Sequence, residues 1–502
     1  MGPTQDRDET SALSIGWRMN SADEPTYWLQ AGSRPGFQPE EELVKVPAST
    51  MATHTAIIGQ SGSGKSAFLG RLVEELLLKT KGRCLIFDPN SDFRRLHEVE
   101  DAKLWTGAAY QKLTGEGRLP DEKTQADFAT AWSKVELVMR GKLIERRKAP
   151  YGTLQIWWPS LSVEFIAENL DTLRRSELYH CHAYLQAVAD LAKWQLVITG
   201  KPLDVIETSE SLWREASSPS GAVSTQRLGT NLRKLSNKLI EKPSKPETGE
   251  FSLLFPSTDT LRMIFESVIR RAVTAIGYVS EQVIRFYFAK AREYRAAGML
   301  QLKPPLVDGL PSHRVEVIDL PSLPGENLRL LAVNSTLATE WARAREAWEK
   351  ALQKPPKEDT RVPTFVILDE AHNMLPAEPT SEAEIALREQ FRTIAAEGRK
   401  YGLFLILASQ RPDKLDSVIL SECGNKVVMR LDSKSILDVS KQLLGLEEVP
   451  SSLLEKTLGF RIGRALLVGR WVPAGPQILY TAARRTIEGG RNLRASHWAQ
   501  LP

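Results

Sequence analysis

The segment "HTAIIGQSGSGKSAFLGRLVEELL" (54–77) constrains the fold of this chain more than any other stretch. Gly59, Gly64, Lys65 and Ser66 match the spacing G-x-x-x-x-G-K-[ST] at every position. A short apolar run precedes the pattern, and apolar residues at helical spacing follow it. In a strand, glycine loop and helix of this order, free main-chain N–H groups surround phosphate oxygens at the helix N-terminus. The segment therefore predicts a nucleotide-binding α/β domain.

This loop also predicts the cofactors, ATP and Mg²⁺. The Lys65 ammonium can reach the β- and γ-phosphates, and the Ser66 hydroxyl can bind the magnesium ion. GTP is disfavoured, because "NKVV" (425–428) lacks the final aspartate of the guanine-reading pattern N-K-x-D. The predicted cofactor-binding residues are Gly59, Gln60, Ser61, Gly62, Ser63, Gly64, Lys65, Ser66 and Ala67.

The segment "TFVILDEAHNML" (364–375) predicts a second strand at the same site. Its apolar run leads directly into Asp369 and Glu370, which would emerge at the end of the strand. Asp369 can then hold magnesium, and Glu370 can accept a proton from the attacking water. The alternative is an acidic helix N-terminus, where carboxylates favour the helix dipole. With the glycine loop in the same chain, hydrolysis is the favoured interpretation.

A third strand is predicted in "LFLILASQRP" (403–412), where an apolar run turns polar within three positions. The segment 382–402 has helical spacing and is long enough for a crossover between parallel strands. Ligands bind at the carboxyl ends of such strands. Gln410 would therefore lie near the γ-phosphate, where its amide can orient water and sense the phosphate.

Two further apolar runs end in an aspartate. "CLIFDPNSDF" (84–93) leads to Asp88, which either assists the metal or water, or caps the following turn; both interpretations stay open. "RVEVIDLPSL" (314–323) leads to Asp319, for which a cap is expected. Both runs predict strands of the same sheet.

Composition excludes several classes of protein. The 502 residues are 42% hydrophobic and 25% charged, as in ordinary globular proteins, and the net charge of +4 does not by itself indicate a nucleic-acid partner. The longest apolar runs fall short of a membrane span, and the polar start does not fit a leader peptide. Three cysteines without a C-x-x-C pair disfavour a disulfide framework. We expect a cytoplasmic protein without a membrane partner.

The order of the motifs resembles that of the HerA-like branch of the HerA/FtsK ATPases, which are hexameric motors that move DNA. The resemblance covers roughly residues 50–95 and 311–480 and ends with "GRALLVGRWVPAGPQIL". It implies a RecA-like core with a mostly parallel sheet, a homohexameric ring, double-stranded DNA as substrate, and a nuclease or other effector subunit as partner. DNA repair and defence against phage DNA both suit this family. A DEAH-box helicase is excluded, because no S-A-T element or second arginine-rich motif follows "DEAH".

The resemblance implies catalytic roles for Lys65, Glu370 and Gln410, and metal binding by Ser66 and Asp369. It also aligns Arg399, in "EGRKYG", with the arginine that such motors insert into a neighbouring subunit's site. From the residues alone, Arg399 could equally be a cation that stabilises the end of its helix. Two alternative functions stay open: a secretion ATPase of the type IV kind, and an ATP-dependent assembly switch.

The motifs suggest five regions along the chain. Residues 51–95 and 311–480 would form the two parts of the core, and residues 96–310 a large, mainly helical insertion. Within that insertion, residues 268–298 predict one long helix, 183–198 another, and 207–226 a Ser- and Gly-rich link. Residues 1–50 are too few for the β-barrel that family members often carry, and residues 481–502 would be a C-terminal tail.

Overall fold

The computed structural model describes residues 12–18, 43–101, 122–141, 151–154, 156, 158, 163, 172–218, 222–241, 257–296, 313–323, 325–353, 355 and 358–489. The chain divides into two compact units. The first, here called the core unit, comprises Met1–Gly152, Gly309–Leu330 and Trp341–Pro502. The second, here called the helical unit, comprises Thr153–Asp308 and Leu331–Glu340.

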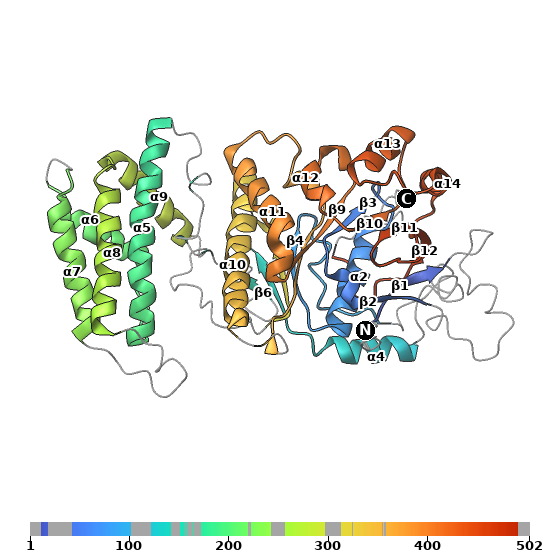
Figure 1. Ribbon diagram of the computed structural model, residues 1–502, viewed down its shortest axis with the longest axis horizontal. Helices are drawn as coiled ribbons and strands as arrows, with labels where there is room; N and C mark the ends of the chain where they lie inside the picture. Colours follow the sequence, from blue (N-terminus) through green and yellow to red (C-terminus); the bar gives the residue numbers. More distant parts are fainter. Residues whose placement is uncertain are drawn as a thin grey trace, which may run out of the picture. The chain divides into compact units, whose positions relative to one another are not determined.

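A single sheet organises the core unit, with the strand order β2-β1-β12-β11-β10-β3-β9-β8-β4-β7-β5-β6 (Figure 1). The strands from β10 to β5 in this order are parallel to one another. The pairs from β10 to β2 on the other side are antiparallel. The strands are β1 (Ala12–Arg18), β2 (Leu43–Pro47), β3 (Thr55–Ile58), β4 (Arg83–Asp88), β5 (Leu137–Gly141), β6 (Tyr151–Thr153), β7 (Val315–Asp319), β8 (Thr364–Leu368), β9 (Leu403–Ser409), β10 (Asn425–Val428), β11 (Arg464–Gly469) and β12 (Gln477–Thr481).

The central strands are uninterrupted apolar runs because helices cover both faces of a parallel sheet. Every residue of β3, β4, β8 and β9 is buried. Helix α2 (Lys65–Lys79) connects β3 to β4, and α11 (Glu382–Tyr401) connects β8 to β9. A capping box starts α11, and Gly402, at φ 81°, ends it in the left-handed conformation. The predicted RecA-like α/β core with a mostly parallel sheet is confirmed.

The core unit contains further short helices around this sheet. They are α4 (Glu122–Trp132), α12 (Ser417–Ser421), α13 (Lys434–Leu443) and α14 (Ser451–Lys456). A long helix, α10 (Glu326–Leu352), follows β7 in the chain, and its residues are divided between the two units. No described helix is both long and apolar enough to cross a membrane.

The sheet extends beyond the segments that carry the motifs. Strand β5 pairs with β7 although it falls within residues 96–310, the range expected to be an insertion. At the opposite edge β1 pairs with both β12 and β2, which places residues from the expected N-terminal segment in the core sheet. These edge strands lack the continuous apolar runs of the central strands. They can therefore be identified only from their pairing with other strands in the structure.

The helical unit contains α5 (Thr172–Thr199), α6 (Val205–Ala216), α7 (Thr225–Glu241), α8 (Thr258–Ile276) and α9 (Glu281–Ala296). The helix expected at 183–198 is part of α5. Two other expectations were wrong. Residues 207–216 belong to α6, whose N-terminus is capped by Asp204 and whose apolar side buries Leu212 and Trp213. The Ser- and Gly-rich composition predicted a link from residue 207 onward, but α6 continues to Ala216 and a link can begin only after it.

The single helix expected over 268–298 is two helices, α8 and α9. Tyr278 and Val279 donate main-chain N–H groups to Ala275 and Ile276, three residues back, so the helical pattern tightens into a turn. The main-chain N–H of Ser280 then donates to a carboxylate oxygen of Glu177 on α5, at 2.7 Å. The apolar spacing runs through this turn and therefore could not indicate it.

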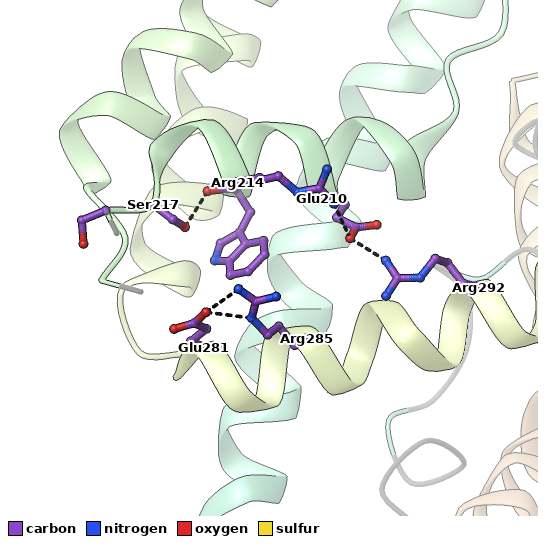
Figure 2. A pocket seen from close by; sticks show the side chains of 8 residues that line it. Glu210, Arg214, Ser217, Glu281, Arg285 and Arg292 are labelled. Carbon is purple, nitrogen blue, oxygen red and sulfur yellow. Dashed lines mark hydrogen bonds and ion pairs between the residues drawn. The ribbon is translucent and has the colours of Figure 1, made fainter. Parts of the chain in front are cut away.

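Charged residues link α6 and α9 around a cavity of 630 Å³ (Figure 2). Glu210 on α6 pairs with Arg214 on the same helix and with Arg292 on α9. Arg285 pairs with Glu281 on α9 and lies over the Trp213 ring at 5.6 Å. Each guanidinium already has a carboxylate partner. The charged residues around this cavity are therefore explained by the ion pairs that they form within and between the two helices.

Candidate functional site

Three central strands end at the same level, and their ends form the candidate site. In the register of the sheet, Ile58 of β3 pairs with Ser409 of β9. Leu407 of β9 pairs with Leu368 of β8. The main-chain N–H of Gly59 also donates to the Ser409 carbonyl at 3.2 Å. The glycine loop after β3, the acidic pair after β8 and Gln410 after β9 therefore leave the sheet together.

The glycines of the loop are required by its conformation. Gly62 and Gly64 have φ values of 69° and 101°, which side-chain-bearing residues rarely adopt. A Cβ at Gly59 would lie 2.8 Å from both the Met429 Cβ and the Ser63 Oγ. The loop thus forms a tight cradle that leaves main-chain N–H groups at the start of α2, as phosphate binding needs.

Lys65 lies inside this cradle. Its side chain is 5% exposed, and its Nζ donates to the Gln60 carbonyl at 3.1 Å. The same nitrogen lies 3.9 Å from Glu370 Oε1. Burial lowers the pKa of the Lys65 ammonium, and the Glu370 and Asp369 carboxylates oppose that effect. A buried cation among acceptors is a suitable partner for phosphate oxygens.

Ser66 and Asp369 supply oxygen atoms suited to magnesium. The Ser66 Oγ donates to Asp369 Oδ2 at 3.2 Å. Burial, with the Glu370 carboxylate next, raises the pKa of Asp369 to about 7. A nearby dication would relieve that cost. Among the described residues no cluster of three or more His, Cys, Asp or Glu could hold a metal, but Mg²⁺ needs only one or two protein ligands alongside substrate phosphates. The residues present therefore fit the ion.

Glu370 has an unusual backbone conformation. Its φ of 42° and ψ of 48° are left-handed, which is uncommon for a residue with a side chain. Its main-chain N–H donates to Asp369 Oδ1 at 2.8 Å. Burial raises the pKa of Glu370, whereas the Lys65 charge and the Gln410 main-chain N–H lower it. Glu370 is the N-cap residue of a short 3-10 helix, Ala371–Asn373, as the alternative expected, but it makes no side-chain cap bond and its carboxylate lies near Lys65.

Two residues at this site, His372 and Asp92, were not singled out from the sequence. His372 Nδ1 lies 3.1 Å from Ser409 Oγ and 3.5 Å from Glu370 Oε2. The Asp92 carboxylate contributes to the raised pKa of Asp369 and of Glu370, after burial as the main cause. Motif spacing could have suggested His372, which lies within "DEAH". Asp92 had no such signal, because the fold alone brings its loop to the site.

The two aspartates after β4 and β7 have structural contacts. Asp88 accepts main-chain N–H groups from Asn90, Asp92 and Phe93 at 3.3, 3.0 and 2.8 Å, which supports the cap interpretation for it. Asp319 makes no side-chain cap bond to the turn that follows it, so the cap expected there is wrong. Its Oδ1 instead accepts the Ser91 hydroxyl at 2.8 Å. The two loops are tied together by that bond.

Arg399 lies far from the glycine loop of its own chain. It is exposed in the last turn of α11, just before the amino end of β9. Gln410 follows the carboxyl end of the same strand, and seven extended residues span about 20 Å. An arginine side chain cannot bridge that distance. Arg399 can therefore contact a nucleotide only in another subunit, or has a role unrelated to nucleotides.

Comparisons with known proteins agree with the motif order. Residues 40–253 match the family model described as "Helicase HerA, central domain", and residues 326–431 match that of the "ATPase family associated with various cellular activities". The DNA double-strand break repair helicase HerA of Pyrococcus furiosus is 30% identical over 214 residues, 38% of this chain and 37% of the relative. The HerA of Sulfurisphaera tokodaii is 28% identical over 171 residues, 33% of this chain and 31% of the relative.

The matched part thus spans about a third of the length of these curated relatives. Among solved structures, the bacterial conjugative coupling protein TrwBdeltaN70 is 12% identical, with 96% of each chain covered and a TM-score of 0.42. VirB4 of Thermoanaerobacter pseudethanolicus is also 12% identical, with 94% of this chain and 96% of that chain covered and a TM-score of 0.36.

Proposed function

Because the chain is a HerA-like ATPase of the HerA/FtsK superfamily, we propose that it hydrolyses ATP to move along double-stranded DNA. One observation carries the proposal: Lys65, Ser66, Asp369 and Glu370 converge where β3 and β8 end. The relatives are described as helicases of double-strand break repair, which supports duplex DNA as the substrate.

In this mechanism the main-chain N–H groups at the start of α2 and the Lys65 ammonium hold the phosphates. Ser66 and Asp369 would hold the magnesium ion, which would supply positive charge next to the phosphate oxygens. Glu370 accepts the proton of the attacking water, and its raised pKa strengthens it as a base. The Gln410 side chain, half-buried after β9, orients that water.

The same proposal includes a homohexameric ring. Arg399 is exposed and lies at the opposite end of β9 from its own site, so a catalytic role requires a neighbouring subunit. A guanidinium inserted between subunits would stabilise transition-state charge and couple hydrolysis around the ring. Without a partner subunit, each chain would hold only part of the catalytic set.

We further propose that a nuclease or another effector subunit acts with the motor, in DNA repair or in defence against phage DNA. The support is the family's association with DNA processing. The described residues contain no recognised nuclease centre, so a separate subunit would cut the DNA. The partner would use the DNA that the ring delivers.

The test measures ATP turnover by the full chain with and without linear duplex DNA, beside Glu370→Gln as the control. We expect turnover that rises on adding DNA and that the control lacks. Slow turnover unaffected by DNA, with full effector assembly on a non-hydrolysable analogue, would favour a nucleotide switch. Turnover stimulated by membranes but not by DNA would favour a secretion ATPase.

A further inference from the structure

The last turn of α11 ends in three consecutive residues whose surroundings differ. Arg399 and Lys400 are exposed, and Tyr401 is half-buried. The Arg399 side chain makes no ion pair or hydrogen bond with any residue that the structure describes. The two residues after it are both held by contacts with α10.

Lys400 and Tyr401 pack against two tryptophans of α10. The Lys400 ammonium lies over the Trp348 ring, 4.0 Å from its centroid, and 5.2 Å from the centroid of the Tyr401 ring. Tyr401 meets Trp341 and Trp348 edge-on, at centroid distances of 5.0 and 5.4 Å. Both kinds of contact are attractive and depend on direction. We call Trp341, Trp348, Lys400 and Tyr401 the aromatic clamp; all four belong to the core unit.

The main chain of the same turn is fixed as well. Arg361 Nη1 donates to the Lys400 carbonyl at 2.8 Å, and Asp359 in turn holds the Arg361 guanidinium at 2.7 Å. The Gly402 N–H donates to the Arg399 carbonyl at 3.3 Å. The carbonyl groups that a helix end leaves free thus have donors here already. The end of α11 is stabilised without the Arg399 side chain, which leaves that side chain available for another role.

We propose that the aromatic clamp positions Arg399 for insertion into a neighbouring subunit's nucleotide site. The inference rests on the proposed role of Arg399 between subunits and adds the residues that position it. Helix ends fray, so a last turn without these contacts would hold the guanidinium at no fixed place. The Lys400 ammonium is engaged by Trp348, so Lys400 and Trp348 act only through Arg399 and are positioning residues.

The test starts from Lys400→Met, which keeps the apolar stem and removes the ammonium over Trp348. In the full chain with Mg²⁺ and ATP, kcat should fall about 10-fold, because a misplacement of about 1 Å can cost up to about 10²-fold. Binding of a fluorescent ATP analogue should stay parental, since Lys400 lies at the opposite end of β9 from its own glycine loop. Lys400→Arg retains a cation for the ring and should restore most of the rate.

Lys79→Met is the matched control. Lys79 is also an exposed lysine in the last turn of a helix, α2, but it contacts no aromatic ring among the described residues. This variant loses the same charge at the same kind of position and should turn over ATP at the parental rate. A fall in kcat confined to Lys400→Met would therefore come from the clamp and not from a lost helix-end cation.

Two further measurements separate positioning of Arg399 from general packing. The double variant Arg399→Ala/Lys400→Met should be no slower than Arg399→Ala alone, because it has no guanidinium left to position. Mixing Lys400→Met with Lys65→Ala subunits should restore part of the activity. The Lys65→Ala subunits supply a correctly held Arg399, and the Lys400→Met subunits supply an intact glycine loop.

Trp348→Leu provides a second route, since it removes the ring and leaves the lysine, and it should lower kcat as Lys400→Met does. It decides the matter if Lys400→Met proves unfolded by its thermal midpoint. Parental turnover in these variants, or a double variant slower than Arg399→Ala by the full Lys400→Met factor, would overturn the inference. Parental turnover by Arg399→Ala would instead contradict the role of Arg399 between subunits, and this inference with it.

Discussion

Lys65, the first residue of α2, and Glu370, two residues after β8, face each other with Nζ and Oε1 3.9 Å apart, although β3 and β8 are not neighbours in the sheet. Strand β9 lies between β3 and β8, and its following residue is Gln410. Gln410, the candidate water-orienting residue, therefore leaves the sheet between the strands that precede the proposed phosphate-binding cation and the proposed base. A water molecule attacking a γ-phosphate would lie within this group of three side chains.

Lys65→Ala should abolish tight binding of ATP. The substitution removes a buried ammonium placed among the phosphate-binding N–H groups, and no other described lysine lies in the loop. Binding of a fluorescent ATP analogue measures the effect, and Lys79→Ala, at the far end of α2, is the control. Parental affinity in the Lys65 variant would show that the nucleotide binds elsewhere.

Glu370→Gln should retain ATP binding and lose turnover. The amide has nearly the same shape but cannot accept the proton of water, and loss of a general base typically slows a reaction about 10²- to 10⁴-fold. Steady-state phosphate release measures turnover, and analogue binding shows that the site is intact. Hydrolysis at the parental rate would remove Glu370 from the mechanism.

Arg399→Ala should bind ATP but hydrolyse it slowly, since arginine fingers contribute about 10³- to 10⁵-fold in rate. Mixing it with Lys65→Ala subunits should restore part of the activity. Each variant retains the half of a shared site that the other lacks, so mixed rings contain some intact interfaces. The Arg399 variant should fold normally, because its side chain is exposed.

The contrary outcome for Arg399 is equally definite. As a cation at the end of a helix it would contribute roughly 0.3–1 kcal/mol of stability and no catalysis. Turnover would then stay near the parental rate. Slow turnover without rescue, in preparations shown by native mass spectrometry to contain mixed rings, would contradict action between subunits.

His54 should make the core unit less stable in acid. Leu405 N–H donates to His54 Nδ1 at 2.8 Å, so the ring's other nitrogen donates to the Ala395 carbonyl at 3.0 Å and the imidazole is neutral. Burial lowers the pKa of His54 to about 4. Between the unfolded value of about 6.5 and 4, the unfolded chain binds the extra proton, so stability should fall as pH falls through this window.

The thermal midpoint from pH 7 to pH 4 measures this effect. His54→Gln, which cannot titrate, should be less stable than the parent at pH 7 and should lose less on acidification. Equal slopes for the two proteins would show that His54 does not carry the proton. The variant also reports how much the link between β9 and α11 contributes at neutral pH.

The central strands and the nucleotide loop could be predicted from the sequence because their signals are local. Each signal lies within a few residues. The apolar run of β9 indicates burial, the glycines at 62 and 64 indicate positive φ angles, and the acids after β8 mark the end of a buried strand. The helix break at Tyr278 and the extent of α6 could not be predicted as well. At Tyr278 the helical spacing of apolar residues continues through a turn. In α6 the Ser- and Gly-rich composition predicted a link where the structure has a helix.

The sequence by itself predicts which residues would hold phosphate and metal, because the spacing of 59–66 and the pair 369–370 are local patterns typical of that chemistry. Only the tertiary structure decided what surrounds them. It placed Asp92 and His372 beside Glu370, held residues 482–489 on α2 through Glu74, and left Arg399 about 20 Å from its own site. These relationships depend on strand order and on the packing of segments hundreds of residues apart, and no local pattern of side chains encodes them.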